Sequence, residues 1–257
     1  MLTLHTNGMT PGALAVAIAL EEKALSFALA ENEWQATPAA LAAFSGADEL
    51  VNSIEGEFPI LADGDVAVND TFFILEYLDD AYPEPPLKPA DAYGQWKVQA
   101  LNRFLGERAM PAVASLGVAE RFTGQGIVDE VAARFENEPL LTPERRDAWG
   151  MALRDPANEE VMAESHRKAA LLLDRIEGEL AESGGPWLLG EGYTITDIAA
   201  FALARPFATG ELRTHDKEIG ERTRHWCARM EKRAAVTTPL QLGEPVFLPA
   251  AEHARWG

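Results

Sequence analysis

The sequence predicts two structural units, an α/β layer over residues 1–82 and an all-helical domain over residues 92–257. Strand-like and helix-like segments follow one another in the first unit in the order β-α-β-α-β-β-α, which is typical of an α/β layer. Four prolines between Tyr82 and Pro89 then indicate a stiff, extended linker, placed at residues 83–91. Beyond residue 92 the apolar residues recur at helical spacing, without convincing strand alternation.

The α/β layer begins with a strand predicted at residues 2–6. Residues 12–23 form a helix whose apolar positions run all round it, as expected of a helix buried against a sheet. Residues 25–30 alternate as a second strand. The later elements are a short helix within residues 34–44, a hairpin of residues 59–62 and 65–68 around Asp63-Gly64, and a helix over residues 70–81.

The helical domain contains its longest predicted helix at residues 159–182, ended by Ser183-Gly184-Gly185-Pro186. Thr142-Pro143-Glu144 is typical of another helix start, with a cap residue before a proline. Thr194 and Asp197 have the spacing of a capping box, which is a folding device and not a chemical one. The proline-interrupted tail, residues 241–257, is predicted to wrap the surface.

Composition excludes several function classes. The formal net charge is -19, from 41 acidic and 22 basic residues. Nucleic acids and anionic membrane surfaces both attract basic proteins, so we expect neither as a partner. The N-terminus lacks the basic and apolar regions of a signal peptide, and no apolar stretch could span a bilayer. We therefore expect a cytoplasmic protein.

Cysteine and histidine give no sign of a metal site. Cys227 is the only cysteine, so no intramolecular disulfide is possible, and we expect it to be an inert, buried side chain. The five histidines show no metal-ligand spacing, and no metal is assigned. Near the end, Trp226, Arg229 and Arg233 share helical spacing. We interpret them as a buried tryptophan with two surface-directed arginines and not as an anion site.

A candidate ligand site lies between Phe58 and Thr71. Pro59 begins a strand, a position to which proline is suited because it cannot donate to a sheet ladder. Asp70 and Thr71 begin a helix, whose unpaired amides can receive an anion. The same two residues are also ordinary helix caps, so a ligand must be argued from Pro59 beside them. A cis Phe58–Pro59 bond would leave the backbone of Phe58 open to pair with an extended, peptide-like ligand, and the hypothesis depends on this geometry.

Thr10 has two interpretations that the sequence leaves open. Its hydroxyl could donate to a thiolate held at the positive end of the first helix, favouring the ionised sulfur. A threonine before Pro11 is equally an ordinary N-cap.

These residues together resemble the glutathione transferase superfamily, over nearly the whole chain. The segment from Asn52 through Gly56-Glu57-Phe58-Pro59-Ile60-Leu61 is similar to the Asn-Pro-x-Gly-x-Val-Pro-x-Leu segment of that family. Asp70-Thr71 with Glu76-Tyr77-Leu78 resembles its glutathione-binding helix. Further matches are the Thr194-to-Asp197 capping box and the final helix with Trp226, Arg229 and Arg233. The resemblance implies a thioredoxin-like first domain, with glutathione held by Phe58, Pro59, Asp70 and Thr71.

Within the superfamily, the strand-two entry Glu22-Lys23-Ala24-Leu25-Ser26-Phe27 and the segment from Tyr82 to Asp91 look most like the bacterial β-etherases. This resemblance implies that glutathione cleaves β-aryl ether bonds of lignin-derived aromatics. The thiolate would attack the carbon that bears the aryloxy group, giving a thioether and a phenol. The resemblance also implies a hydrophobic aromatic second substrate, bound between the domains, and a dimer.

One departure from the family bears on activity. The β-etherases carry Asn-Ser at the start of the first helix, where this chain has Gly12-Ala13, and neither side chain can donate a hydrogen bond. Thr10-Pro11-Gly12-Ala13 also resembles the Thr-Pro-Asn-Gly of another bacterial group, again without the asparagine, and Ala15 replaces a frequent lysine. Losing such donors at a thiolate site could remove several kcal/mol of charge stabilisation.

Three hypotheses remain open. The chain could be an active transferase that uses Thr10 or backbone amides, or a catalytically silent subunit paired with a less acidic paralogue. It could also be a protein-binding adaptor on the same fold. Aromatic candidates for the second-substrate pocket are Trp96, Phe104 and Phe207, although core packing explains each equally well.

Overall fold

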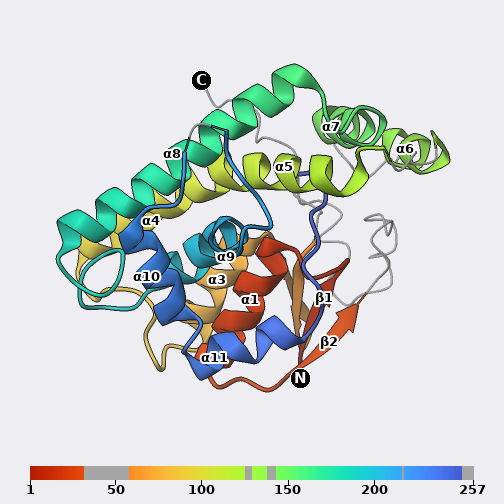
Figure 1. Cartoon of the computed structure of the whole chain (residues 1–257). Coiled ribbons are helices and arrows are strands. Elements are labelled where there is room, and N and C mark those ends of the chain that lie inside the picture. The colour runs from red at the N-terminus through yellow and green to blue at the C-terminus, as the bar shows by residue number, and fades with distance from the viewer. Residues whose placement is uncertain (32–57, 125–128, 138–142, 216, 251–257) are drawn as a thin grey trace.

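The structure is a computed structural model that describes residues 1–31, 58–124, 129–137, 143–215 and 217–250 (Figure 1). The predicted helix within residues 34–44 and the segment Asn52 to Glu57 lie outside the described residues.

The sheet has the strand order β2-β1-β3-β4, with β1 parallel to β2 and antiparallel to β3, and β3 antiparallel to β4. A parallel pair requires a crossover, which α1 supplies. This arrangement confirms the thioredoxin-like prediction for the first domain. The bounds are β1 Leu2–Thr6, α1 Pro11–Glu22, β2 Phe27–Glu31, β3 Ile60–Asp63, β4 Val66–Asn69 and α3 Thr71–Ala81.

The second strand and the hairpin begin one or two residues later in the structure than the sequence predicts. The second strand begins at Phe27 and not at residue 25, because Ala24 takes a left-handed conformation (φ 52°) and the Leu25 amide still bonds back to Leu20 O at 2.9 Å. The hairpin strands each lie one residue later than predicted, with Gly64 at φ 62° in the turn. Such a φ suits glycine.

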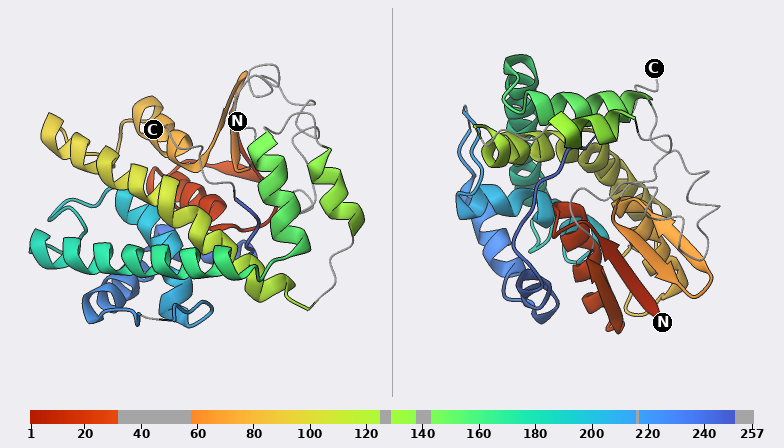
Figure 2. Two further views of the ribbon diagram at one scale, coloured as in Figure 1. Left: turned by 90° about the horizontal axis from the view of Figure 1, so that it is seen from above. Right: turned by 90° about the vertical axis from the view of Figure 1, so that its right-hand side faces the viewer.

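The second domain consists of helices joined by loops, as predicted. Among its described residues, β-pairing is limited to isolated bridges. Its elements are α4 Ala92–Phe104, the π-helical turn η2 Leu105–Ala109, α5 Met110–Phe122, α6 Asp129–Glu136, α7 Pro143–Arg154, α8 Glu159–Ser183, α9 Ile195–Thr209, α10 Glu221–Met230, α11 Ala234–Thr237 and the 3₁₀ turn η3 Pro239–Gln241. Figure 2 shows α4 and α5 as one rod beside α8. None of the helices in the described part of the chain is long and apolar enough to cross a membrane.

Helix α1 is the element that both domains share. Residues 12–20 are buried without interruption, which confirms the prediction of an all-round buried helix. On one side α1 packs against α3, and on the other against α9 and α11 (Figure 1). The thioredoxin-like domain and the helical domain therefore have one continuous core.

The linker is not a free spacer, because a buried ion pair fixes its course. Lys23 Nζ, at the end of α1, lies 2.5 Å from Asp79 Oδ1 and donates to the carbonyl oxygens of Tyr82 and Pro85 at 2.8 and 2.7 Å. Asp79 Oδ1 also accepts from the Leu87 amide at 2.7 Å. A buried charge pair is tolerated when further hydrogen bonds satisfy it, and here those bonds come from the linker backbone.

The prediction that two arginines of α10 and its following turn point to the surface was wrong for Arg233. Its guanidinium makes a bidentate ion pair with Glu22 at 2.6 and 2.7 Å and lies 3.9 Å from the ring centroid of Tyr193. Glu22 is far away in sequence, so helical spacing could not reveal this partner. Arg229 is exposed, and Trp226 is fully buried, as predicted.

The capping box at the start of α9 is confirmed, and Asp197 does more than cap. Its buried carboxylate accepts from the amides of Leu188 and Thr194, from the Thr194 hydroxyl and from Trp226 Nε1, at 2.9 to 3.1 Å. Burial raises the pKa of Asp197 to about 6, and the donated hydrogen bonds oppose that rise. One carboxylate thus joins α9, α10 and the turn after α8.

The substitution Asp197→Asn is expected to lower the free energy of unfolding by roughly 1–3 kcal/mol at pH 7, because an amide nitrogen would face donors that now lack an acceptor. The wild-type carboxyl has a higher pKa in the folded state than its ordinary value of 3.8. The folded state therefore binds more protons between pH 4 and 6, and this group's contribution to stability falls by about 3 kcal/mol as pH rises through that window.

Chemical denaturation of both proteins between pH 4 and 7 tests this. The stability gap between wild type and variant should be larger at pH 4.5 than at pH 7. A gap that does not vary with pH would contradict the assignment to Asp197.

Candidate ligand-binding site at two helix N-termini

The predicted site residues converge where α1 begins. A methyl group placed on Gly12 Cα would overlap Thr71 Oγ1 and lie 3.4 Å from Pro59 Cδ. The N-terminus of α1 is therefore in contact with the first residue of α3 and with the proline at the start of β3. Three segments that the sequence placed separately form one site, and glycine permits their close approach.

Thr10 is the N-cap of α1, and its Oγ1 accepts from the Ala13 amide at 3.2 Å. The structural interpretation of Thr10 is thus confirmed. A hydroxyl that accepts one hydrogen bond can still donate another. Among the described residues, no acceptor takes the Thr10 proton, so the capping role leaves it available to a ligand.

Asp70 caps α3 from a strained backbone, with φ 69° and ψ 133°. A non-glycine residue at such a φ costs of order 1–3 kcal/mol, and such residues cluster at functional sites. The expectation that the first amides of α3 are unpaired was partly wrong, because Asp70 Oδ1 accepts from Phe72 N at 2.8 Å and Phe73 N at 3.2 Å. The buried Thr71, by contrast, has no hydrogen bond to any described residue through its amide or its hydroxyl.

The Phe58–Pro59 peptide bond is cis, as the site hypothesis requires. Phe58 precedes β3 and is half-buried. Within the ranges that the structure describes, no hydrogen bond engages the Phe58 backbone.

Sequence reasoning missed the π-helical turn η2 between α4 and α5. A methyl group on Gly106, within this turn, would lie 2.8 Å from the ring of Phe72, which follows Thr71 on α3. Extra-wide helical turns occur often at functional sites. A glycine inside an otherwise helical pattern was the only signal of this contact.

The C-terminal tail does not merely wrap the surface. Residues 245–248, which we call the strap, pair with the loop between β1 and α1: Pro245 bridges Met9, and Val246 N donates to Met9 O at 3.1 Å. Phe247 is buried against Gly117 of α5, where a methyl group would overlap its ring. Leu248 is buried with Trp149 and Leu153 of α7. The strap thus connects the residue before Thr10 to the helical domain.

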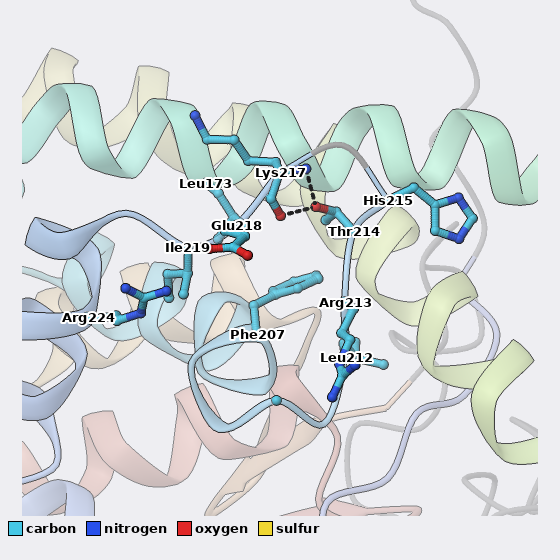
Figure 3. A pocket seen from close by; sticks show the side chains of 11 residues that line it. Leu173, Phe207, Leu212, Arg213, Thr214, His215, Lys217, Glu218, Ile219 and Arg224 are labelled. Atoms are coloured by element: carbon cyan, nitrogen blue, oxygen red, sulfur yellow. Dashed lines mark hydrogen bonds between the residues drawn. The ribbon is translucent and has the colours of Figure 1, made fainter.

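The aromatic candidates for a second-substrate pocket lie apart from one another. Trp96 is exposed on α4 and stacks on Tyr93 with ring centroids 5.5 Å apart, so core packing does not explain it. The hollow that it lines is bordered by residues of the helical domain. Phe207 lines a cavity of about 530 Å³ that none of the predicted site residues borders, and His215 on its rim points away from Phe207 (Figure 3). Phe104 is half-buried against the main core.

Cys227 is buried, and burial raises the pKa of its thiol to about 12, which confirms the expectation of an inert side chain. In the part of the chain that the structure describes, no group of three or more His, Cys, Asp or Glu residues could hold a metal ion.

Comparison with known proteins adds to this geometry. Residues 140–233 match the model of the glutathione S-transferase C-terminal domain. Over this segment the chain is similar to that domain family. The crystal structure of β-etherase LigF from Sphingobium sp. strain SYK-6 superposes with a TM-score of 0.73 at 24% identity, covering 93% of this chain and 98% of that one. The whole chain thus has the glutathione transferase fold, and the resemblance found in its sequence is confirmed.

Sequence matches to individual relatives are partial. Protein LigF of the same organism is 28% identical over 153 residues, which span 58% of this chain and 58% of LigF. Glutathione S-transferase Z2 of Arabidopsis thaliana is 64% identical over 36 residues, 14% of this chain and 16% of that protein. A glutathione transferase family member from Pseudomonas fluorescens Pf-5, crystallised with two glutathione bound, superposes with a TM-score of 0.65 at 21% identity, covering 93% of this chain and 91% of that one.

The contact at Gly12 gives a first test of the site. Gly12→Ala should lower stability by about 1–3 kcal/mol, since the added methyl overlaps Thr71 Oγ1. Gly178→Ala in α8, where nothing lies within 4 Å, should instead raise stability by up to about 1 kcal/mol. Thr71→Ala removes the overlapping oxygen, so Gly12→Ala should cost less in that background. Equal costs in both backgrounds, measured by urea denaturation, would show that the two residues do not touch.

The strap gives a second test. Phe247→Ala should cost roughly 3–5 kcal/mol and should speed hydrogen exchange at the Val246 and Thr10 amides. Phe73→Ala, which truncates a side chain that is 62% exposed, should change stability by less than about 0.5 kcal/mol. Unchanged exchange at residue 10 in the Phe247 variant would mean that the strap does not order this loop.

Proposed function

We propose that this protein is a glutathione-dependent transferase that cleaves β-aryl ether bonds of lignin-derived aromatics. The contact of Gly12 with Thr71 and Pro59 carries the proposal, because it brings two helix N-termini and the backbone of Phe58 to one place. The glutathione-bound relative and the likeness to β-etherase LigF support glutathione as the ligand and an aryl ether as the second substrate.

Each part of glutathione has a matching group. The amide and hydroxyl of Thr71 would donate to the γ-glutamyl carboxylate, and the Asp70 carboxylate would face its ammonium group. The Phe58 backbone would pair with the peptide portion. The Thr10 hydroxyl would donate to the sulfur, near the positive end of α1. Asp70 keeps its capping bonds while doing this, because a carboxylate accepts several hydrogen bonds.

The chemistry follows from a stabilised thiolate. Loss of the thiol proton leaves a sulfur anion, which attacks the carbon that bears the aryloxy group. A C–S bond forms as the C–O bond breaks, and the phenolate leaves with the bonding electrons and takes up a proton. The products are a glutathione thioether and a phenol. The protein contributes placement of the sulfur and a lowered thiol pKa.

A silent subunit is the second candidate, and one observation favours it. Gly12 and Ala13 offer no side-chain donors, and the Ala13 amide already donates to Thr10 Oγ1. In that case a paralogous partner would perform the chemistry. Exposed aromatic residues on α3 and α4 (Phe73, Tyr93 and Trp96, each more than half exposed) support association with a second subunit in either case, as a dimer in the cytoplasm.

The test combines binding with turnover. The purified chain should be retained on immobilised glutathione and should release phenol from a β-aryl ether model compound only when glutathione is present. Thr71→Ala should weaken glutathione binding roughly ten-fold, equivalent to one lost charged hydrogen bond. Thr209→Ala, on the exposed end of α9, is the matched control and should leave binding unchanged.

Thr10 decides between the two candidates. Thr10→Ala should raise the pKa of the bound glutathione thiol, read from thiolate absorbance against pH, and should lower turnover, whereas Thr10→Ser should retain both properties. Full turnover by Thr10→Ala in a preparation that contains a co-purified paralogue would favour the silent subunit. Absence of glutathione binding would overturn both candidates.

A further inference from the structure

A cavity of about 560 Å³ lies in the helical domain between α5, α7 and the first two turns of α8, with Pro249 and Ala250 along one side. Its volume is within the usual range for small-molecule sites, about 300–1,000 Å³. No residue of the proposed glutathione site lines it. The cavity is therefore separate from that site.

The floor of the cavity is apolar. Its apolar lining consists of the buried residues Pro111, Ala112 and Val118 of α5, together with Met151 of α7 and Met162 of α8. We call this lining the floor. Met151 is 49% exposed, which is high for a methionine in a helix that packs on a neighbour. Methionine adapts its shape to different apolar ligands. The floor thus suits an aromatic or aliphatic body.

The rim carries only negative charge. Four carboxylates line the cavity, and none of the lining residues that the structure describes is a lysine or an arginine: Asp147, Asp155, Glu160 and Glu164. Glu164 is engaged by Arg167 at 2.6 Å, which lowers its pKa to about 2, and Asp155 accepts from Asn158 at 3.0 Å. Asp147 and Glu160 have no ion-pair partner among the described residues.

A buried hydroxyl lies between the floor and the rim. Ser165 of α8 is only 5% exposed and lines the cavity, yet within the described residues it has no hydrogen-bond partner. Ser165 Oγ is not among the fully buried side-chain atoms that lack a partner, so it reaches the accessible space of the cavity and can accept a hydrogen bond there. An ammonium group can donate that bond.

The N-terminus of α8 also borders the cavity, and its dipole alone would attract an anion. Glu159 and Glu160 occupy the first turn of α8 and offset that partial charge of about half a unit. Arg167 and Lys168 both pair with Glu164, so the lining carboxylates left to attract a cation are Glu160, Asp147 and Asp155. We propose that this cavity binds a hydrophobic organic cation, with its aryl or alkyl body on the methionine floor and its primary ammonium at Ser165 and Glu160.

Two probes of equal shape and opposite charge test the proposal: 2-naphthylmethylamine, cationic at pH 7, and 2-naphthoate. Each probe is titrated into the full-length protein, and binding is measured by calorimetry and by NMR. The amine should show saturable binding. Naphthoate should bind at least roughly ten-fold more weakly. Equal binding of both probes, or no binding of the amine, would overturn the proposal.

The neighbouring glutamates Glu159 and Glu160 allow a matched control, because only Glu160 lines the cavity. Glu160→Gln and Asp147→Asn should each weaken amine binding about three-fold or more, and Ser165→Ala should weaken it further. Glu159→Gln makes the same charge change one residue away, outside the cavity lining, and should weaken binding clearly less than Glu160→Gln does. Equal weakening by Glu159→Gln would indicate attraction to the acidic surface as a whole and would overturn the site.

A filling substitution gives independent evidence. Ala112→Leu should abolish amine binding by occupying the floor. Should that variant fail to fold, the charge variants still decide the question. Concentration-dependent dimerisation of wild type that is lost in Glu160→Gln would assign the cavity to a second copy of the chain, and this too would overturn the proposal.

Discussion

The rest of the structure depends on the complete burial of α1. A helix without a solvent-facing side must be covered on all sides, and here the sheet and α3 cover part of it while α9 and α11 cover the remainder. Small residues make this possible, since six of the ten residues from 11 to 20 are Gly, Ala or Pro. Because the N-terminus of α1 is also one wall of the ligand site, packing between the domains fixes the position of Thr10.

Local signals in the sequence predicted much of the fold and of the site. The all-round apolar pattern of residues 12–23 predicted a buried helix, and Pro59 with Asp70 and Thr71 indicated the candidate site, whose use by a ligand stays a prediction. These features are local because proline, capping residues and periodicity act through their immediate neighbours. A cap at the start of α3 was one of the two interpretations of Asp70 and Thr71, and Asp70 is that cap, but its strained φ of 69° was not predicted.

Features that rest on distant partners were missed. Arg233 was assigned to the surface because its partner Glu22 is far away in the sequence, and no local pattern indicates their ion pair. Phe247 and Leu248 stand as isolated apolar residues between prolines, so no periodicity marked the strap. The π-helical turn at Leu105–Ala109 differs from an α-helix by one extra residue, which a short hydrophobic pattern cannot resolve. In each case the deciding information is tertiary.

The strap has a consequence for how the protein is made. Synthesis proceeds from residue 1, so Met9 leaves the ribosome long before Val246, its hydrogen-bond partner. The hydrogen bond between Met9 and Val246, which holds the loop that carries Thr10, can therefore form only after almost the entire chain has been synthesised. A nascent chain that ends after α3 would already contain every residue assigned to glutathione, but not the segment that holds this loop in place.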